Sequence, residues 1–387
     1  MRGHIVQRYP GSGSYSIKVS IGKDATTGKY KYQWFTVKGD RKNAEKRLTE
    51  ILHQIDTGSF MQPGKTTVAE YLNRWIGDYA KSNLSPRTVE GYEHIIKRYI
   101  IPRIGDTLLA HVRPEHLQRF YADELTIGLS AQTVRHHHMV LHKALQNAVE
   151  WGLAIRNVAD AVKAPRAQRV EMQTWNESEI TQFLEVAKTT PYYEVFFLAL
   201  FTGMRRSELL ALRWCDVDLI YGQIHVSRSL HVLKSGQPVF RSPKTAAGRR
   251  TIALTPSTSL MLTEYREKRE AESILLGKPI ADMDLVFNAL GKHLLPNTVT
   301  HAWSKLVKHS GLRSIRLHDA RHSHASLMLK QGVHPKIVQE RLGHSSIQIT
   351  LDTYSHVAPG LQEAAAKRFD DAFKLKHNEN VAEKISS

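Results

Sequence analysis

The spacing of apolar residues changes at two proline-containing breaks, and this change most constrains how the chain can fold. Before the first break, at Pro63 and Gly64, apolar and polar residues alternate over 15–21 and again over 30–37. Such alternation is typical of half-buried strands. Beyond that break, apolar residues recur mostly at helical spacing, and the second break covers 164–169. A chain of 387 residues is also long enough for two or three compact domains.

We therefore expect a multidomain α+β protein. Residues 1–63 are predicted to form a small three-stranded β-sheet backed by one helix. A helical domain with its linker is expected over 64–168, and a mainly helical domain with a small β-sheet over 169–375. The polar residues 376–387 are expected to form a flexible tail.

Helix starts can be predicted from residues that cap a helix N-terminus. Ser85, followed by Pro86, and Ser130 are expected to be N-caps. Either Asn176 or Ser178 is expected to cap the first helix of the third domain. In that domain, short strands are expected over 224–226, 229–233 and 251–254, and helices up to 187 and over 193–201, 207–214, 257–275, 297–309, 319–331, 335–342, 346–354 and 361–373.

The charge of the chain indicates a polyanionic partner. Lys plus Arg exceed Asp plus Glu by 54 − 37 = +17, and residues 1–65 alone carry 12 − 5 = +7. An excess of this size attracts nucleic acid through counterion release and field steering. A charge that only aids solubility remains the alternative at this point.

Cysteine usage and hydropathy bear on the compartment. Cys215 is the single cysteine, which excludes an internal disulfide and a cysteine-based metal site and fits a reducing compartment. No apolar run approaches the roughly 20 residues that cross a bilayer, and the first residues lack the apolar stretch of a secretory signal. We expect a cytoplasmic protein with no membrane partner.

Three consecutive histidines, His136, His137 and His138, invite comparison with a metal site. Adjacent positions on a helix differ by about 100°, so the three side chains cannot converge on one ion. We expect them to be solvated or to face DNA, and we expect no metal site and no cofactor.

A set of arginine and histidine residues suits the binding of a phosphodiester. Arginine binds two phosphate oxygens through its planar fork and keeps its charge. Arg205 follows a glycine where the chain bends, and Arg321 lies one helical turn after His318, on the same face. Glu208 has the same spacing from Arg205 and is placed to orient its guanidinium. The alternative makes both arginines ordinary surface ion-pair partners.

Tyr354 supplies a nucleophile for the same reaction. A tyrosine has a pKa of about 10, so its attack on phosphorus needs nearby positive charge or a base. An isolated tyrosine at this position would be a packing residue. Its occurrence with Arg205, Arg321, His318 and His344 in one ordered series instead favours cleavage of a phosphodiester.

These segments resemble the tyrosine recombinases, the integrase family of temperate phages and conjugative elements. The resemblance covers about residues 170–375 and rests on Thr202-Gly203-Met204-Arg205, Leu212-Arg213-Trp214, Leu317-His318-Asp319-Ala320-Arg321-His322, Leu342-Gly343-His344 and Tyr354. It implies a site-specific recombinase that cleaves DNA through a 3′-phosphotyrosyl bond. The covalent bond preserves the free energy of the phosphodiester, so neither ATP nor a metal is required.

The resemblance also implies a role for each residue of the site. Arg205, Arg321 and His344 hold the phosphate, His318 assists proton transfer, and Tyr354 attacks. Lys244 would protonate the leaving 5′-hydroxyl, and Glu208 and Asp216 would be supporting residues. The alternative for Lys244 is that it is one more cation beside Arg241, Arg249 and Arg250.

Outside the third domain the resemblance is weaker but persists. Residues 66–165 look like the helical core-binding domain of the family, and residues 1–60 look like an arm-binding sheet, although small basic sheets have other uses. We expect double-stranded DNA with core-type and arm-type sites as the partner. The candidate DNA-contact residues are Lys18, Lys29, Lys31, Tyr32, Trp34, Arg87, Arg135, Arg241, Arg249 and Arg250.

The expected helix at 361–373 carries apolar residues near helical spacing. By resemblance, it packs against a neighbouring protomer in a homo-tetramer on DNA. A host DNA-bending protein and an excision factor are further expected partners.

Three alternatives remain open from the sequence. One is a host-type recombinase that resolves chromosome dimers, which the added N-terminal segment disfavours. A second is a DNA-binding regulator without catalysis, which the complete residue set disfavours. The third is a type IB topoisomerase-like enzyme, which would relax supercoils without a specific site.

Overall fold

The structure is a computed structural model that describes residues 3–7, 13–23, 28–56, 65–167, 172–243, 245–354, 366–367 and 369–371. The chain divides into two compact units, Met1–Gln168 and Arg169–Ser387. No helix within the described ranges is long and apolar enough to cross a membrane. The expected tail at 376–387, and most of the expected helix at 361–373, lie outside the described residues.

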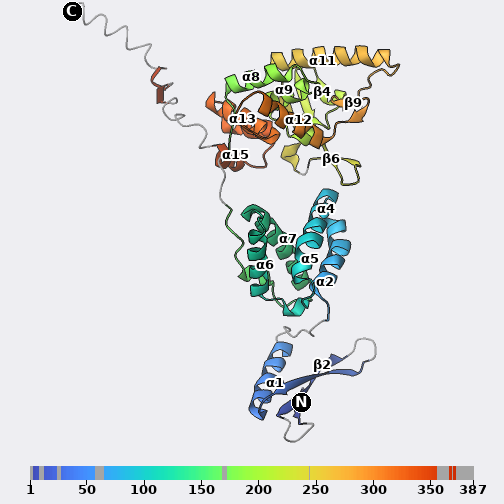
Figure 1. Ribbon diagram of the computed structural model, residues 1–387, viewed down its shortest axis with the longest axis vertical. Coiled ribbons are helices and arrows are strands. Elements are labelled where there is room, and N and C mark those ends of the chain that lie inside the picture. The colour runs from blue at the N-terminus through green and yellow to red at the C-terminus, as the bar shows by residue number, and fades with distance from the viewer. Residues whose placement is uncertain are drawn as a thin grey trace, which may run out of the picture. The chain divides into compact units, whose positions relative to one another are not determined.

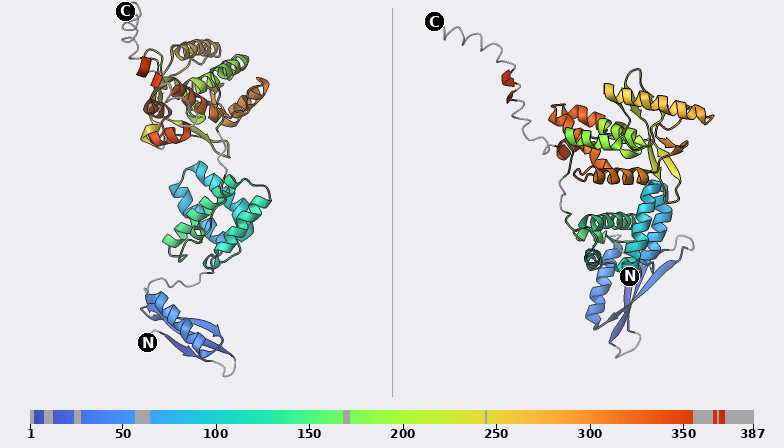
Figure 2. Two further views of the ribbon diagram at one scale, coloured as in Figure 1. Left: turned by 90° about the vertical axis from the view of Figure 1, so that its left-hand side faces the viewer. Right: turned by 45° about the horizontal axis from the view of Figure 1, so that its top comes forward.

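The first unit begins with the predicted sheet of three strands. The strands β1 (Gly3–Val6), β2 (Ser14–Lys23) and β3 (Tyr30–Lys38) are antiparallel and lie in that order. Helix α1 (Arg41–Asp56) lies across one face of the sheet (Figures 1 and 2). A small core forms between them because alternate strand residues meet one side of α1, and its buried members are Ile17, Val19, Ala44 and Ile51.

The helical part of the first unit follows, as expected from its apolar spacing. Its elements are α2 (Val68–Trp75), which continues through η1 (Ile76–Ala80) into α3 (Lys81–Asn83); α4 (Pro86–Ile95), which continues through η2 (Ile96–Ile100) into α5 (Ile101–Ile104); and η3 (Leu109–His111), α6 (Pro114–Thr126), α7 (Ala131–Glu150) and η4 (Val158–Ala161). Ser85 and Ser130 both accept a backbone hydrogen bond at the start of their helices. Both predicted N-caps are therefore confirmed.

The histidine run on α7 corrects one prediction. His137 is buried, and its Nδ1 lies 2.8 Å from Oε1 of the buried Glu124 on α6. His138 is half-buried, with Nδ1 2.8 Å from the hydroxyl of Tyr121. The prediction of solvated or DNA-facing side chains was wrong for His137. Consecutive residues on a helix point in different directions, and His137 is the one of the three that points into the core.

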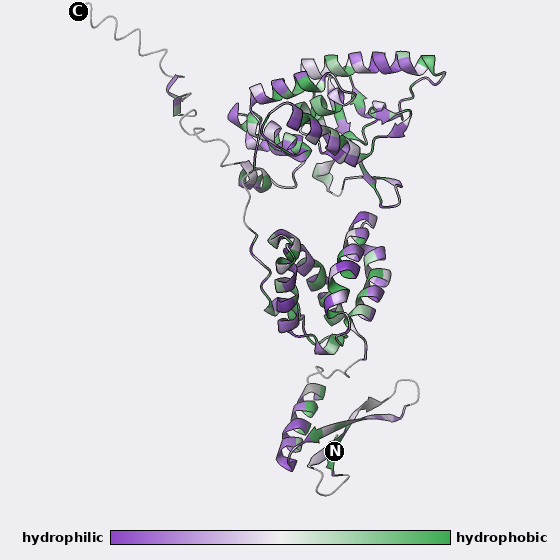
Figure 3. Cartoon of the chain, viewed as in Figure 1, coloured by the Kyte–Doolittle hydropathy of each residue, from purple (hydrophilic) through white to green (hydrophobic). Residues whose placement is uncertain are grey.

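The second unit is mainly helical. Its helices are α8 (Glu177–Ala187), α9 (Tyr193–Thr202), α10 (Arg206–Leu209), α11 (Pro256–Leu275), α12 (Pro296–His309), α13 (Leu317–Lys330), α14 (Pro335–Leu342) and α15 (Ile347–Tyr354). Helix α9 is almost entirely buried, whereas α11 lies at the edge of the unit with a hydrophilic middle and a hydrophobic end (Figure 3). Asn176, rather than Ser178, caps α8 through a reciprocal bond with Glu179.

Aromatic side chains form the centre of this unit. Trp303 of α12 packs on Phe183 of α8, with ring centroids 4.4 Å apart, and on Trp175, at 5.3 Å. Phe196 of α9 meets the edge of the Trp303 ring. The packing anchors α8, α9 and α12 to one another and so positions α9 within the unit.

The strands of the second unit are short. A three-stranded antiparallel sheet has the order β4 (Val217–Asp218), β5 (Gln223–Val226) and β8 (Arg250–Ala253), a hairpin joins β6 (Ser229–Val232) to β7 (Pro238–Arg241), and β9 (Asn288–Ala289) pairs with β10 (Lys292–His293). The strands expected at 224–226, 229–233 and 251–254 are present. Strand β7 and the two-residue strands were not predicted.

The helix expected over 207–214 is much shorter than its apolar pattern suggested. Helix α10 ends at Leu209. Further on, the backbone N–H of Trp214 donates to the carbonyl of Asp284 at 3.1 Å, and that of Cys215 to Asp282 at 2.8 Å. A neighbouring segment therefore accepts the bonds that a continuing helix would have made internally.

Candidate active site

Two left-handed glycines bring the loops of the site together. Gly203 ends α9 with φ +66°, and Gly343 ends α14 with φ +69°. A Cβ on Gly203 would lie 2.8 Å from side-chain carbons of His324 and Leu342, and one on Gly343 would lie 2.7 Å from the carbonyl oxygen of Ala247. Both turns therefore require glycine, for the backbone angle and for the close approach of the neighbouring segment.

Arg321 of α13 joins these two loops. Its side chain is buried and donates to the carbonyl oxygens of Gly203, at 2.9 Å, and Leu342, at 2.6 Å. Burial and the charge of Arg205 lower the pKa of Arg321 to about 9, so the guanidinium is still protonated at neutral pH. Among the described residues it makes no ion pair with a carboxylate, and such a buried cation favours binding of an anion.

Glu208 holds the second arginine of the site. Nη1 of Arg205 donates to Oε1 of Glu208 at 2.7 Å, which is the contact expected from their spacing. Nη2 of Arg250 donates to Oε2 of the same carboxylate at 2.8 Å. Burial by itself would raise the pKa of Glu208, but the hydrogen bond and charge of Arg250 and the charge of Arg205 hold it below the usual value.

Arg250 differs from its predicted role. We expected it to contact DNA, but its side chain is only 5% exposed, and Nε donates to the carbonyl of Arg341 at 2.6 Å. It is a buried partner of Glu208. No sequence signal marks this pairing, because the two residues are 42 positions apart and belong to different elements.

A residue of α15 orients the side chain of His344. Its Nδ1 lies 2.8 Å from Oγ1 of the buried Thr350, and its ring lies nearly parallel to that of Tyr354 with centroids 6.5 Å apart. Burial and the charges of Arg321 and Arg205 lower the pKa of His344 to about 3. The imidazole is therefore neutral at physiological pH, with its ring orientation fixed by Thr350.

Tyr354 is fully buried at the end of α15. Its hydroxyl lies 2.7 Å from Nδ1 of His322 on α13. Burial raises the pKa of Tyr354 to about 12, although the charges of Arg321 and Arg205 oppose the change. The sequence interpretation gave His322 no role. Its position four residues after His318, on the same helical face, is the signal that could have identified it.

The structure brings together five of the six residues predicted to be catalytic: Arg205, His318, Arg321, His344 and Tyr354. The ring of His318 lies 5.1 Å from that of His322, on the exposed side of the cluster. Partial desolvation and the charge of Arg321 lower the pKa of His318. Lys244 lies outside the described residues.

Asp216, the second predicted supporting residue, contacts a different arginine. Its Oδ2 accepts from Nε of Arg213 at 2.9 Å, and its Oδ1 accepts from the hydroxyl of Ser227 at 2.9 Å. Asp216 thus stabilises the turn that follows α10. Its contact with the site is indirect.

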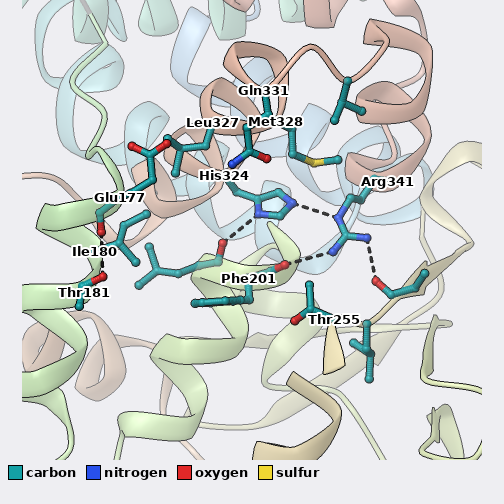
Figure 4. A pocket seen from close by; sticks show the side chains of 14 residues that line it. Glu177, Ile180, Thr181, Phe201, Thr255, His324, Leu327, Met328, Gln331 and Arg341 are labelled. Carbon is teal, nitrogen blue, oxygen red and sulfur yellow. Dashed lines mark hydrogen bonds between the residues drawn. The ribbon is translucent and has the colours of Figure 1, made fainter. Parts of the chain in front are cut away.

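A second network of hydrogen bonds, made by His324 and Arg341, stabilises the end of α9 before Gly203 (Figure 4). His324 bonds through Nδ1 to the carbonyl of Leu200 at 2.9 Å, and its Nε2 accepts from Nε of Arg341 at 3.0 Å. Arg341 also donates to the carbonyls of Phe201, at 3.1 Å, and Ala253, at 2.8 Å. These bonds join α9, α13, α14 and β8 beside a pocket of about 470 Å³.

The outer face of the N-terminal sheet carries several of the predicted DNA-contact residues. Nζ of Lys18 lies 4.2 Å from the ring centroid of Tyr32 and 5.6 Å from that of Trp34. Tyr32 is 53% exposed and Trp34 45% exposed. Lys29 and Lys31 are also exposed. Lys18 therefore shares one accessible surface with Tyr32 and Trp34.

The remaining predicted DNA-contact residues lie on several elements. Arg87 is exposed on α4, Arg135 on α7, and Arg241 on β7; Arg249 is exposed just before β8.

Within the described part of the chain, no group of three His, Cys, Asp or Glu side chains is arranged to hold a metal ion.

Comparisons with known proteins match both units. The model of the Phage integrase family matches residues 173–360, which include the whole cluster. A second model, Phage integrase, N-terminal SAM-like domain, matches residues 67–125 in the helical part of the first unit. Together the two models cover most of the chain.

Curated relatives resemble the chain over nearly its full length. A tyrosine recombinase XerC-like protein of Caldanaerobacter subterraneus subsp. tengcongensis is 26% identical over 382 residues, with 94% of this chain and 97% of that protein covered. The ICEBs1 integrase of Bacillus subtilis is 26% identical over 362 residues, with 93% and 98% covered.

A solved structure, a lambda integrase tetramer bound to a Holliday junction, has the same fold. Its TM-score is 0.57 at 20% sequence identity, over 91% of this chain and 94% of that one. The matched family models, the full-length relatives and the clustered arginines, histidines and tyrosine lead to one conclusion. The chain belongs to the phage integrase family of tyrosine recombinases, enzymes that break and rejoin DNA.

Proposed function

We propose that this integrase cleaves and rejoins DNA at specific attachment sites through Tyr354, and that it thereby integrates and excises a mobile element. One observation carries the proposal: the Tyr354 hydroxyl lies in a cluster whose buried guanidinium, that of Arg321, lacks a carboxylate partner among the described residues. A phosphodiester would supply the missing negative charge next to a nucleophile.

The chemistry follows from the groups in the cluster. Tyr354 attacks the scissile phosphorus, its O–P bond forms, and the bond from phosphorus to the 5′-oxygen breaks. Arg205 and Arg321 neutralise the non-bridging oxygens, and neutral His344 donates a hydrogen bond. The reverse attack by a 5′-hydroxyl rejoins the strand and frees the tyrosine.

The proton for the leaving 5′-oxygen is assigned to Lys244. An ammonium group on the segment between β7 and β8 is a suitable general acid for an alkoxide. The assignment rests on the family resemblance of Pro243-Lys244-Thr245. Glu208 is proposed as a support for Arg205, and Asp216 as a support for the turn after α10.

Residues 64–168 and residues 1–63 are proposed to choose the DNA. The helical part would bind core-type sites beside the point of cleavage. The sheet, with Lys18, Tyr32 and Trp34 on its outer face, would bind separate arm-type sites. Deletion of 1–63 should abolish binding to arm-type DNA and spare cleavage at the core site; equal loss of both would overturn the arm-binding role.

Double-stranded DNA and a homo-tetramer are the proposed assembly, in the cytoplasm where the DNA lies. The lambda integrase structure is a tetramer on a Holliday junction, and a similar arrangement here would couple four active sites. The forward and reverse chemical steps are nearly equal in free energy. Direction must therefore come from outside the site, through a host DNA-bending protein or an excision factor.

The test of the function uses a nicked suicide duplex that traps the covalent intermediate. The wild-type protein should form a covalent complex, and Tyr354→Phe should form none while it still binds the duplex in a shift assay. Covalent DNA on Tyr354→Phe would sink the assignment of the nucleophile. Binding by the wild type without any covalent complex would instead favour a non-catalytic regulator.

Two further outcomes separate the remaining alternatives. Relaxation of supercoiled plasmids without a specific site would indicate a topoisomerase-like enzyme. Recombination at a chromosomal dimer-resolution site, and not at element ends, would indicate a host-type recombinase.

A further inference from the structure

His322 contacts the reacting oxygen but has no part in the chemistry above. Its Nδ1 lies 2.7 Å from the Tyr354 hydroxyl, and the two ring centroids are 5.6 Å apart. Among the hydrogen bonds of the described residues, His322 and not His318 is the histidine bonded to Tyr354. His318 lies one helical turn before His322 on α13, and the two rings meet edge to face with centroids 5.1 Å apart.

We propose that His322 is a catalytic residue that accepts the phenolic proton of Tyr354, an inference that rests on the proposed function. As the tyrosine oxygen bonds to the scissile phosphorus, its proton moves to Nδ1 of His322 and the bond from phosphorus to the 5′-oxygen breaks. The 5′-oxygen takes its proton from a separate donor, assigned above to Lys244. During rejoining, His322 returns its proton to the departing tyrosine oxygen.

The buried tyrosine needs such an acceptor. Burial raises the pKa of Tyr354 to about 12, so roughly one molecule in 10⁵ carries the phenolate at pH 7. Attack by the neutral phenol requires loss of the proton during the same step, because an oxygen bonded to phosphorus is far less basic than a phenolate. The group that already holds this hydrogen is the nearest acceptor.

His322 is in the right protonation state to accept. Burial and the neighbouring His318 lower the pKa of His322 to about 4, Arg321 and Arg316 act in the same direction, and Asp319 opposes them. The imidazole is therefore neutral at physiological pH, and with its proton on Nε2 it accepts at Nδ1. A phosphate anion bound by Arg321 would stabilise the imidazolium formed during attack.

Three variants of the full-length protein separate proton transfer from packing. His322→Phe keeps a ring and removes both nitrogens. His322→Asn keeps a polar atom near the position of Nδ1 and cannot act as a base. His309→Phe, at an exposed position near the end of α12, is the matched control.

The measurement is the rate of covalent-complex formation on a suicide duplex that carries the attachment site mapped with the wild type. A second duplex replaces the 5′-bridging oxygen with sulfur. A thiolate is a good leaving group and needs no proton from a general acid. Cleavage of this duplex therefore does not require the general acid, but it still requires deprotonation of Tyr354. Lys244→Ala should therefore regain cleavage on the sulfur duplex.

We expect His322→Phe to lower the cleavage rate by about 100-fold or more on both duplexes, with DNA binding unchanged and His309→Phe at the wild-type rate. His322→Asn should stay at least about tenfold below wild type. Its rate should rise about tenfold per pH unit from pH 6 to 8, because hydroxide replaces the missing base, whereas the wild-type rate should change little.

Four outcomes would overturn the role of His322: a His322→Phe rate within about threefold of wild type, rescue of that variant by the sulfur duplex, wild-type cleavage by His322→Asn, or a flat pH profile for the asparagine variant. If His322→Phe fails to bind DNA, the asparagine variant decides. Absence of a covalent complex with the wild type would refute the proposed function itself, so the two failures are distinguishable.

Discussion

Two arginine–carboxylate pairs in the second unit share one local pattern but differ in their surroundings. In Arg205–Glu208 and in Arg316–Asp319, the arginine is an N-cap, and the acid three residues later accepts its backbone N–H. Both carboxylates are buried, but Glu208 is shared with the buried Arg250, whereas Asp319 pairs with Arg316, whose side chain is 79% exposed. The same local device begins both helices, but the partners of Arg205 belong to the active site.

The difference shows what local sequence leaves open. Arg205 gains its position from residues distant in the chain: Gly343, whose carbonyl oxygen lies 3.4 Å from Nη2, and Arg250, which binds the other side of the shared carboxylate. Arg316 has a similarly short bond to its acid, at 2.8 Å, but no second arginine among the described residues shares that acid. Function should therefore be more sensitive to the first pair than to the second.

The largest expected contrast is in cleavage. Arg205→Ala should lower the rate of covalent-complex formation by about 100- to 1,000-fold, or about 3–4 kcal/mol of barrier, because the cation proposed to neutralise the phosphate in the transition state is lost. Arg316→Ala should remain within about threefold of wild type. The assay is the suicide duplex with equal DNA occupancy. Similar losses in the two variants would break the comparison.

The next contrast is in stability. Glu208→Gln should lower the free energy of unfolding by about 3 kcal/mol, because Arg250 would be buried without its counter-charge. Asp319→Asn should lower the free energy of unfolding by about 1 kcal/mol. The Arg316 side chain is largely solvated, and the asparagine side chain can still accept the N-cap backbone hydrogen bond. Urea unfolding measures both values. Equal costs would show that burial of the pair is not what distinguishes it.

The pH dependence of the same variants sharpens this result. The folded pKa of Glu208 lies below its unfolded value, near 4.3, so its contribution is fully present above that pH and is lost as the pH falls through the folded value. Wild-type stability should thus fall in acid below about pH 4. Glu208→Gln should show a shallower fall.

The smallest contrast concerns the turn that closes on Arg205. Gly343→Ala should cost roughly 2–3 kcal/mol, because a positive φ is combined with a contact on the Ala247 carbonyl, and it should also slow cleavage. Gly311 has φ +68° with open space around it, so Gly311→Ala should cost roughly 1 kcal/mol and leave cleavage unchanged. Thermal unfolding and the suicide duplex test the pair; equal effects would remove close packing as the cause.

Much of the fold could be predicted because it depends on local signals. Ser85 and Ser130 cap the helices that were expected, and α12, α13, α14 and α15 lie within a residue or two of their predicted ranges. The three-stranded sheet followed from alternation in the first 40 residues. The finer division at residues 63 and 64, the tail and the DNA-contact residues other than Arg250 stay predictions.

Errors occurred where distant segments competed with a local pattern. The apolar run after Ser207 fits a helix, yet the backbone N–H groups of Trp214 and Cys215 are bonded to the segment at 282–284. His137 belongs to a polar run, yet a carboxylate on α6 draws it into the core. In both cases the competing partner is distant in the sequence.

The sequence by itself determined which chemical groups the site contains and the order in which the chain supplies them. His318 and Arg321 had to share a helical face, because one turn separates them. Only the tertiary structure decided which groups touch: Glu208 with Arg250, Thr350 with His344, and His322 with Tyr354. The reason is physical, since helical periodicity fixes neighbours within a few residues, whereas contacts between elements depend on packing of the whole unit.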